Sequence, residues 1–417
     1  MTQLSGDCFA SGSRLMTTAE ALALLEARVV AVTEAETVPL GGAFGRILAE
    51  SVVSSREVPP YDNSAVDGYA VFFDDLDAER ETRLPVTGSV AAGHPLGRPA
   101  RPGEAIRIFT GAPMPEGPDT VMMQEDCVLD GDRVILRPGI KRGANRRLAG
   151  EDVKAGTTIL KAGQRLRPQD IGLAASVGRT EIQVRRGLRV GLFSTGDELC
   201  DPGSEAPPGC IYDSNRHTLA ALLDGLGCAV TDLGILPDRL EPIRETLEEA
   251  AAGNDLVISS GGMSVGEEDH VKAAVEALGS LHFWQLAIKP GRPIALGQIG
   301  HVPFIGLPGN PAAVMVAFLR LARPVVLKLA GCTEVTPTVF RVRADFDHRK
   351  KPNRREWVRA RLVTDGAGGL KARKFPREGA GILTSMVEAD GLVELPEDMT
   401  QLKAGMMVDF LPFSEVS

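Results

Sequence analysis

Apolar and polar positions follow two alternating patterns through the middle of the chain. Short, almost wholly apolar runs, such as 188–193 and 255–259, alternate with amphipathic segments such as 215–227 and 239–252. This alternation is typical of parallel strands that helices cover on both faces. We therefore predict a central three-layer α/β/α domain with a mostly parallel sheet over residues 187–332.

The pattern changes on either side of this central segment. Between about residues 59 and 132, short apolar runs are interrupted by Gly and Pro, which indicates a small β-rich domain. Residues 140–184 continue with β-like turns and one short helical stretch. Beyond Gly331, strand-like runs such as 339–343 and 407–411 fit a small antiparallel barrel or sandwich. The chain is thus predicted to be a multidomain α/β and β protein, with an N-terminal two-part β-rich region and a C-terminal small β-barrel.

The first residues combine a polar tail with a helix-start signal. Residues 1–13 are small and polar, so we expect a disordered tail there. Thr17 and Glu20 have the spacing of a capping box, in which each side chain bonds the other residue's backbone N–H. Apolar positions from Leu22 to Val32 then predict a helix.

Length, composition and charge indicate a large folded protein without a nucleic-acid partner. A chain of 417 residues exceeds what one compact core usually holds, which predicts several domains. The 43% hydrophobic and 24% charged content is ordinary for a globular protein, and the 46 Gly and 28 Pro predict many turns. The net charge of −9 and the lack of a long Lys/Arg block argue against nucleic acid, because neutralising phosphates needs concentrated positive charge.

Cysteines, histidines and apolar runs argue against several further classes. The six cysteines include no CxxC pair and the six histidines are scattered, so no zinc motif is visible. Free thiols in a reducing compartment are the expected state. The start lacks a signal-peptide pattern, and the longest apolar candidate, 314–329, contains Arg320, Arg323 and Pro324. We therefore expect a cytoplasmic protein that does not bind a membrane.

Three Gly- and Pro-rich loops follow predicted strands of the central domain, at 195–199, 260–269 and 306–311. In an open parallel sheet the ligand binds beyond the carboxyl ends of the strands, where such loops converge. Glycines allow close backbone approach and a helix N-terminus adds partial positive charge, so phosphate or another oxyanion is the natural ligand. Asn310 is the predicted N-cap of the following helix and Pro311 its first residue. The candidate binding residues are Ser194, Thr195, Gly261, Gly262, Ser264, Gly266, Pro308, Gly309, Asn310 and Pro311.

Charged residues near these loops indicate two ion sites. Glu198 and Asp269 are oxygen donors of the kind that hold Mg²⁺ together with phosphate oxygens. Lys289 and Arg292, separated by a Pro-Gly turn, would clamp an oxyanion such as molybdate or phosphate. Each feature alone has a plain alternative: a structural Gly-Gly turn, a surface acid, a good helix start or a solvated hairpin turn. No GxxxxGK[ST] or GxGxxG element follows the first strand, which argues against the commonest ATPase and dehydrogenase sites.

An ordered set of short motifs extends over nearly the whole chain. The motifs lie at 60–70, 110–115, 147–152, 194–199, 211–215, 261–269, 289–293, 306–311, 354–360 and 383–386. Each motif alone is weakly specific, whereas the ordered set is highly specific. The set resembles the molybdopterin molybdenumtransferase family, the bacterial relatives of the gephyrin E domain and of the plant cofactor-insertion protein.

The resemblance implies a reaction and a set of functional residues. In that reaction molybdate enters adenylylated molybdopterin, and AMP and the active molybdenum cofactor are released with the help of a divalent cation, here expected to be Mg²⁺. Thr110, Lys289 and Arg292 join the substrate-binding residues named above. The acids that match functionally important ones in relatives, and are therefore expected to be catalytic, are Asp67, Asp152, Glu198 and Asp269.

Individual roles follow as hypotheses. Glu198 and Asp269 would bind the Mg²⁺ that bridges the pyrophosphate-like linkage and lowers the charge cost of its cleavage. Asp67, on a loop of the second domain, would reach into the cleft and orient the substrate. Two alternatives stay open, because Asp67 in Asp-Gly is also a routine turn residue and Asp152 is also suited to a strand end. Two positions depart from the family pattern: Arg292 stands where lysine is frequent, and Ala380 stands where serine is common, which puts any hydroxyl role there in doubt.

The resemblance also implies an elongated four-domain subunit and a homodimer, with the cleft between the central domain and the partner's second domain. Molybdopterin adenylyltransferase, molybdoenzymes and their chaperones are further candidate partners. The expected division is a tail at 1–13, a linker and dimerisation domain at 14–55 plus 148–186, a small β-rich domain at 56–147, the molybdopterin-binding α/β domain at 187–332 and the barrel at 333–417.

Two other functions compete with this interpretation. Molybdopterin adenylyltransferases use the same α/β domain with a similar glycine loop, but they consist essentially of one domain. The motif at 62–70 and the C-terminal β region argue against that alternative here. A gephyrin-like receptor scaffold is the second alternative, and the chain shows nothing that resembles the additional linker of such a scaffold.

Overall fold

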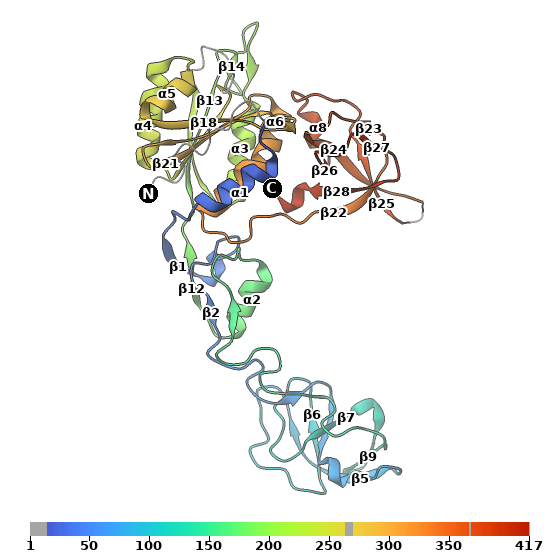
Figure 1. The fold of residues 1–417 in the computed structure, drawn as a ribbon. Helices are drawn as coiled ribbons and strands as arrows, with labels where there is room; N and C mark the ends of the chain where they lie inside the picture. Colours follow the sequence, from blue (N-terminus) through green and yellow to red (C-terminus); the bar gives the residue numbers. More distant parts are fainter. Residues whose placement is uncertain (1–14, 263–269, 367, 417) are drawn as a thin grey trace.

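The computed structural model describes residues 15–262, 270–366 and 368–416. The subunit is elongated: Figure 1 shows an α/β domain and a β-barrel side by side at one end, a small sheet domain at the other end, and a slender connecting unit between them. Within the described residues, no helix combines the length and the apolar character needed to cross a membrane.

The central domain is built on a six-stranded sheet, as predicted. In spatial order the first four neighbouring strands are parallel, and the last two pairings, of the fourth strand with the fifth and of the fifth with the sixth, are antiparallel. The sheet is thus mostly parallel. Its strands, in spatial order, are β16 (Ala229–Leu236), β13 (Arg189–Thr195), β17 (Leu256–Ser260), β21 (Val302–Leu307), β20 (Pro293–Ile299) and β18 (Gly279–Gln285).

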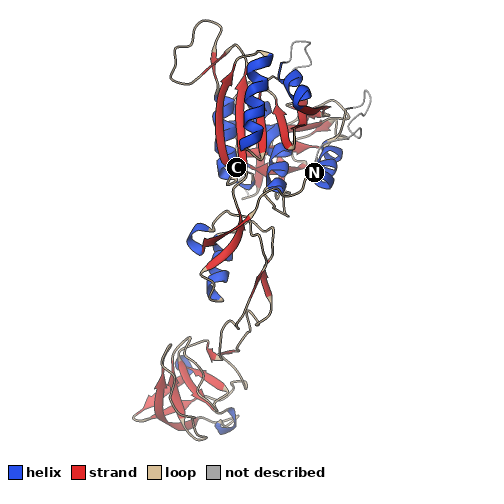
Figure 2. Cartoon of the chain, turned by 90° about the vertical axis from the view of Figure 1, so that its left-hand side faces the viewer, coloured by secondary structure: helices blue, strands red, loops and turns tan. Residues whose placement is uncertain are grey.

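Helices cover both faces of this sheet, which gives the three layers visible in Figure 2. Successive side chains of a strand point to opposite faces, so that along β13 Leu192 packs in one core and Phe193 in the other. The Phe193 core includes residues of α4 and α5, and the Leu192 core includes residues of the other helices. The helices are α1 (Thr18–Arg28), α3 (Ser214–Gly225), α4 (Leu240–Gly253), α5 (His270–Leu278), α6 (Pro311–Ala317) and α7 (Arg323–Leu329).

Two helix predictions are confirmed. The capping box of α1 is confirmed: the Glu20 backbone N–H donates to Thr17 Oγ1 at 3.2 Å, and the Thr17 N–H donates to Glu20 Oε2 at 2.8 Å. The long helix predicted from Asn310 is confirmed, because the chain is helical without interruption from Pro311 to Leu329, but its middle turn, Phe318–Ala322, is π-helical. Pro324 explains the π-turn, since in a regular α-helix its ring would clash with the carbonyl of residue 320 and it cannot supply the N–H.

The C-terminal region forms a closed five-stranded barrel, which confirms the predicted β-barrel. Each strand pairs with two others in the ring β22–β25–β24–β26–β28, and β28 pairs back to β22. A short strand from the α/β domain, β19 (Ile288–Lys289), pairs with β24 from outside the ring. The elements are β22 (Phe340–Ala344), β23 (His348–Arg349), β24 (Arg355–Thr364), β25 (Leu370–Lys374), α8 (Thr384–Val387), β26 (Gly391–Leu395), β27 (Gln401–Leu402) and β28 (Met407–Pro412).

The connecting unit combines two separate stretches of the chain. Strand β1 (Ala35–Pro39) pairs with β12 (Glu181–Arg185), and β2 (Val52–Val53) pairs with β11 (Thr158–Leu160). Helix α2 (Pro168–Ser176) packs beside them. The chain therefore leaves through this unit to the small sheet domain and returns through it.

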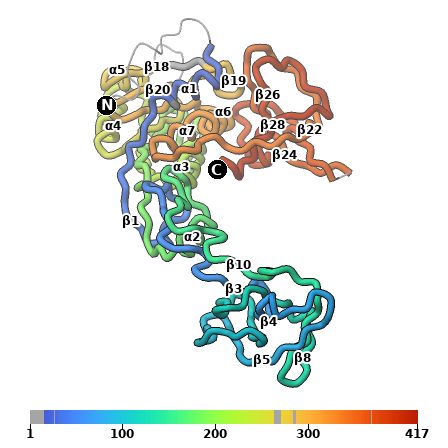
Figure 3. Tube along the Cα trace, turned by 60° about the horizontal axis from the view of Figure 1, so that its bottom comes forward, coloured from blue at the N-terminus to red at the C-terminus, as the bar shows by residue number. Residues whose placement is uncertain are grey.

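The small sheet domain lies at the far end of the subunit, where Figure 3 shows it below the connecting unit. It holds six strands in the order β7-β4-β6-β5-β9-β8. A two-stranded ladder, β3 (Asn63–Ser64) with β10 (Arg146–Arg147), lies where the chain enters and leaves it. The six strands are β4 (Gly68–Val71), β5 (Thr82–Val90), β6 (Ala105–Ile108), β7 (Thr120–Met123), β8 (Cys127–Asp130) and β9 (Arg133–Leu136).

Candidate functional site

The three predicted loops meet at one edge of the central sheet. Strand β17 lies between β13 and β21, so the loops that follow these parallel strands are neighbours. The Gly261 N–H donates to the carbonyl of Leu307 at 3.1 Å. Asn215 Nδ2 donates to Ser260 Oγ at 3.0 Å and to the Gly309 carbonyl at 2.6 Å, and thereby joins two of the loops.

This edge is also the switch point of the sheet. The chain runs from β13 outward to β16 and then returns to the other side of β13 to form β17. The loops after β13 and β17 therefore diverge, and ligands of open α/β sheets bind in the crevice that such a divergence leaves.

Glycine is required at two positions of the loop after β17. Gly261 and Gly262 have φ angles of +85° and +65°. A Cβ on Gly261 would lie 2.6 Å from the Thr195 carbonyl oxygen, and one on Gly262 would lie 2.5 Å from Val271 Cγ2. The sequence therefore uses glycine here to let two loops come together at backbone distance.

Several buried polar atoms at this edge have no hydrogen-bond partner in the described part of the chain. They are Ser194 Oγ, Thr195 Oγ1, Ser259 Oγ and Asn215 Oδ1. Ser194 and Ser259 are both 0% exposed. An unpaired buried polar group costs about 1–3 kcal/mol, so a polar ligand or water at this edge would be stabilised by these atoms.

The acidic residues of the predicted magnesium site are only partly described. Glu198 is exposed and lies after β13, where its backbone carbonyl accepts from the Ile211 N–H at 2.7 Å. Asp269, Ser264 and Gly266 lie outside the described residues. The joint Glu198–Asp269 ligand set therefore stays a prediction.

The loop before α6 has a different contact from the one predicted. Asn310 is the N-cap by position and Pro311 the first helical residue, but the Asn310 side chain makes no capping hydrogen bond. The backbone N–H of Ala312 instead donates to the Ala380 carbonyl of the barrel at 2.8 Å. The start of α6 is thus in direct contact with the barrel.

A second concave site lies between the α/β domain and the barrel. It has a volume of about 160 Å³ and receives Lys289, Pro290 and Gly291 from the α/β domain. Gly291 faces the loop of the sheet edge, since a Cβ added to it would lie 3.5 Å from Pro308 Cγ. The other lining residues come from the barrel: His348, Glu356, Trp357, Val358, Arg359, Lys374, Phe375, Arg377, Glu378, Gly379 and Ala380. We call this site the barrel pocket.

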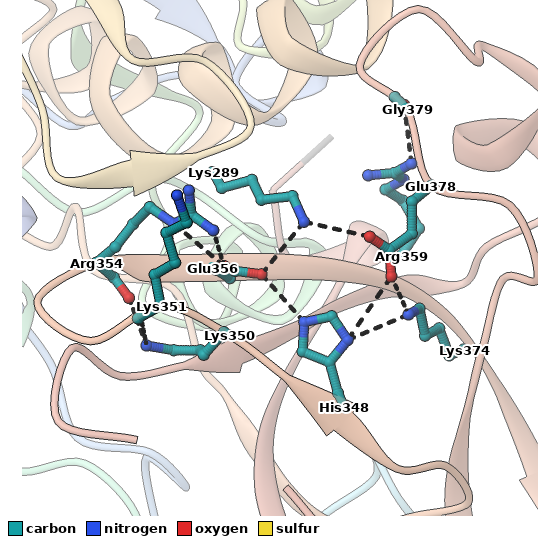
Figure 4. Close-up of polar contacts among 10 residues, drawn as sticks. All are labelled: Lys289, His348, Lys350, Lys351, Arg354, Glu356, Arg359, Lys374, Glu378 and Gly379. Atoms are coloured by element: carbon teal, nitrogen blue, oxygen red, sulfur yellow. Dashed lines mark hydrogen bonds and ion pairs between the residues drawn. The ribbon is translucent and has the colours of Figure 1, made fainter. Parts of the chain in front are cut away.

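The two predicted oxyanion ligands separate here. Lys289 lies in the barrel pocket, and its Nζ is 3.2 Å from Glu378 Oε2 and 3.6 Å from Glu356 Oε2 (Figure 4). Arg292 is exposed and does not line this pocket. The structure therefore places Lys289 among charged barrel residues and does not bring Arg292 to the same pocket.

Hydrogen bonds keep both pocket carboxylates ionised. Burial by itself would raise the pKa of Glu356, but hydrogen bonds from His348 and Arg354 outweigh it and lower the pKa to about 2. The hydrogen bond from Lys374, with help from Lys289, lowers the pKa of Glu378 to about 2. At neutral pH the pocket therefore contains fixed negative as well as positive charges.

His348 links these charges into one chain of contacts, which Figure 4 shows. Its Nδ1 lies 3.1 Å from Lys374 Nζ, and its Nε2 lies 3.0 Å from Glu356 Oε2. An ammonium group can only donate and a carboxylate can only accept. The partners therefore assign the hydrogen of the ring to Nε2.

Arg359 is a buried cation that lines the barrel pocket. It is 9% exposed, and burial lowers its pKa. Its Nε donates to Ser385 Oγ at 3.0 Å and its Nη2 to the Gly379 carbonyl at 3.0 Å. These two bonds hold the planar guanidinium in one orientation, as recognition of an oxyanion requires.

Sequence reasoning did not name most of the pocket residues. Arg359 and Ser385 lie in the motifs 354–360 and 383–386, which were signals of the family but not of a role. His348 and Lys374 lie alone on barrel strands with no motif around them. Their convergence depends on how the barrel closes.

The remaining predicted acids lie far from both sites within one subunit. Asp67 precedes β4 in the small sheet domain (Figure 3), where Thr110 donates to its Oδ1 from the backbone N–H at 2.7 Å and from Oγ1 at 2.8 Å. The backbone hydrogen bond, reinforced by the hydroxyl, lowers the pKa of Asp67. Asp152 is exposed, and its N–H donates to the Val58 carbonyl at 3.1 Å. The structure therefore brings Asp67 and Thr110 together but not next to the sheet edge of the same subunit.

Comparisons with known proteins cover nearly the entire chain. Three family models match: the MoeA N-terminal region (domain I and II) over residues 16–178, a probable molybdopterin-binding domain over 191–328, and the MoeA C-terminal region (domain IV) over 341–413. A solved molybdopterin biosynthesis MoeA protein from Pyrococcus horikoshii is 30% identical, with a TM-score of 0.83, and the match covers 96% of this chain and 100% of that one.

Curated relatives agree with the family models. The molybdopterin molybdenumtransferase of Haemophilus influenzae is 38% identical over 386 residues, which cover 92% of this chain and 95% of that protein. The molybdopterin molybdenumtransferase of Nostoc is 37% identical over 388 residues, which cover 89% of this chain and 87% of that protein. The chain therefore belongs to the molybdopterin molybdenumtransferase family.

Proposed function

We propose that this protein is an enzyme of molybdenum cofactor biosynthesis that inserts molybdate into adenylylated molybdopterin and releases AMP. The relatives named above carry the name of this activity. The observation that carries the proposal is the contact between the sheet edge and the barrel pocket, two anion sites of different chemistry. The backbone N–H of Ala312, directly after the loop at 306–311, donates at 2.8 Å to the carbonyl of Ala380, which lines the barrel pocket.

The two sites suit the two substrates. The sheet edge offers closely packed glycines and buried unpaired hydroxyls, which fit the polar groups of an adenylylated pterin. The barrel pocket is small and its lining includes four cationic side chains and two carboxylates, which leaves an excess of two positive charges for a dianion such as molybdate. The cations are Lys289, Arg359, Lys374 and Arg377.

A divalent cation is part of the proposal. Glu198 presents an exposed carboxylate beside the sheet edge. Mg²⁺ typically takes one or two carboxylates and completes its shell with substrate phosphates and water. We propose Glu198 and Asp269 as its ligands, and the bound ion would reduce the charge repulsion in the phosphate linkage.

The proposed active unit is a cytoplasmic homodimer. The small sheet domain with Asp67 lies at the opposite end of the subunit from the sheet edge (Figure 1). Asp67 of the partner subunit would complete the cleft beside Gly261 and orient the bound pterin. Its lowered pKa keeps this carboxylate charged at neutral pH.

The decisive assay measures AMP release from adenylylated molybdopterin, titrated with molybdate and Mg²⁺. We expect AMP and active cofactor to appear together and to depend on molybdate. A protein that instead made adenylylated molybdopterin from ATP, with no molybdate-dependent AMP release, would be an adenylyltransferase and would contradict the proposal. A protein with neither activity that captured a receptor segment would be a scaffold.

A further inference from the structure

One buried arginine connects the α/β domain to the barrel. Arg320 lies in the π-helix between α6 and α7, and its Nη2 is 3.1 Å from Glu394 Oε2 on β26. Both side chains are only 12% exposed. The guanidinium carbon of Arg320 also lies 5.7 Å from the ring centroid of Trp357 on β24, within cation–π range.

Glu394 connects Arg320 to strand β24, which lines the barrel pocket. Its carboxylate accepts from Trp357 Nε1 at 3.2 Å and from Arg355 Nη1. Arg355 in turn pairs with Glu397 Oε2 at 2.9 Å. One carboxylate therefore collects three donors, two from β24 and one from the π-helix.

Strand β24 connects the contacts of Arg320 to the barrel pocket. Trp357 and Arg359 are two residues apart and so share one face of the strand, and both line the pocket. The same strand pairs with β19, where Lys289 lies opposite Glu356. The position of Arg359 relative to the α/β domain thus depends on how β24 packs against Arg320 of the π-helix.

The helix is shaped to present this arginine. Pro324 disrupts the regular helix at the carbonyl of residue 320, and the wider π-turn turns Arg320 to the barrel. Burial lowers the pKa of Arg320, and its Nε has no partner among the described residues. An apolar side chain would hold two domains together without this desolvation cost, so the arginine is better explained by specific positioning than by stability alone.

We propose that Arg320 is a positioning residue for molybdate binding, which fixes β24 and thereby the width of the barrel pocket through Glu394 and Trp357. The proposal rests on the proposed function of that pocket. Arg320 itself does not line the pocket, so its effect on an oxyanion passes through the strand.

The test compares Arg320→Met, which keeps much of the apolar volume but removes the charge, with the wild-type full-length protein. Calorimetric titration with molybdate should show about fivefold to tenfold weaker binding, a typical size for coupling through a packed network. In the AMP-release assay the KM for molybdate should rise by the same factor. The kcat at saturating molybdate should stay close to wild type, because only binding is affected.

Matched variants separate positioning from general loss of charge or stability. Arg341→Met removes an exposed barrel arginine whose Nε is 3.4 Å from Asp409 Oδ1, and should bind molybdate as the wild type does. Arg320→Lys keeps the charge without the planar fork and should recover part of the affinity. If Arg320→Met does not fold, Arg320→Lys and Glu394→Gln take its place, and the double variant should be less than additive because the two groups touch.

Hydrogen exchange on the same proteins provides an independent readout. The Arg355 N–H donates to the Ala287 carbonyl at 2.7 Å across the two domains, and its exchange should become faster in Arg320→Met. Wild-type molybdate affinity in Arg320→Met would overturn the inference. If the wild type itself bound no molybdate, the proposed pocket function would fail, and unchanged exchange at Arg355 would then overturn the positioning role as well.

Discussion

The sheet edge and the barrel pocket offer an anion two opposite environments, although the hydrogen bond from Ala312 to Ala380 connects the two sites. The sheet edge relies on close glycine contacts and buried unpaired hydroxyls, and the loop after β13 adds the exposed carboxylates of Asp197 and Glu198. The barrel pocket relies on buried charges that are already paired with one another. Binding at the sheet edge therefore depends on the close approach of its loops. Binding in the barrel pocket depends on the balance between its positive and negative side chains.

The largest expected effect comes from filling the space at the sheet edge. Gly261→Ala places a Cβ 2.6 Å from the Thr195 carbonyl and forces a non-glycine residue to a φ of +85°. We expect AMP release to fall by a factor of roughly one hundred or more, because a displacement of about 1 Å near the reacting groups already costs this much.

Gly309→Ala is the matched control for this change. A Cβ there would lie 3.8 Å from its nearest neighbour, Gly261 Cα, and Gly309 has no positive φ. Its activity should fall clearly less than that of Gly261→Ala, because the added Cβ displaces no atom. Equal losses in the two variants would show that the close approach of the loops is not what the site needs.

The next effect comes from removing a fixed charge in the barrel pocket. Arg359→Met deletes a buried guanidinium held by Ser385 and Gly379. Molybdate affinity should fall about tenfold to one hundredfold, since a hydrogen bond to a charged group contributes about 1.5–3 kcal/mol. Arg377→Met removes an exposed cation from the same pocket and should cost clearly less, so equal losses in calorimetric titration would contradict the role of Arg359.

Acid should affect the barrel pocket through its carboxylates. The pKa values of Glu356 and Glu378 are lowered from the ordinary 4.5 to about 2 in the folded protein. A lowered folded-state pKa stabilises the fold fully above the unfolded value and loses that effect as pH falls from 4.5 towards 2.

Urea titrations at several pH values, followed by hydrogen exchange in β24, measure this effect. The stability of the barrel should decrease over that acidic window, and Glu356→Gln should flatten the dependence. A barrel whose stability did not change between pH 4.5 and 2 would contradict the assigned ion pairs.

The smallest effect compares two fully buried serines, one in each site. Ser259 Oγ at the sheet edge has no partner among the described atoms, whereas Ser385 Oγ near the barrel pocket accepts from Arg359 at 3.0 Å. Ser259→Ala should leave the free energy of unfolding unchanged or raise it by up to about 1 kcal/mol, and Ser385→Ala should lower it by about 1 kcal/mol. Thermal unfolding of the ligand-free proteins checks the sign, and a destabilised Ser259→Ala would mean that its hydroxyl is satisfied.

The same contrast explains what the sequence could predict. The sheet edge was predictable because strand ends, glycines and a helix start are local signals, and parallel strands bring their carboxyl ends to one edge. The mostly parallel sheet and the C-terminal barrel were also predictable from local signals, because short apolar runs mark their strands. The π-turn inside the long helix was not predicted, because apolar periodicity does not show how the chain accommodates Pro324.

The barrel pocket was not predictable from local pattern. His348 and Lys374 come from separate strands, and they meet Lys289 only because β19 of the α/β domain pairs with β24 of the barrel. The Lys289–Arg292 pair looked like one clamp in sequence, yet the structure turns only Lys289 into the pocket. Such charge networks form only when strands and domains that are distant in sequence pack together. The sequence gives the residues of the network but not their contacts.

The most direct measurement of the central claim is anomalous X-ray diffraction at the molybdenum edge from crystals soaked in molybdate. Molybdate binding in the barrel pocket, with the pterin at the sheet edge, predicts one strong anomalous peak between Lys289 and Arg359. A peak beside Gly261 and Gly309, with none in the barrel pocket, would contradict it.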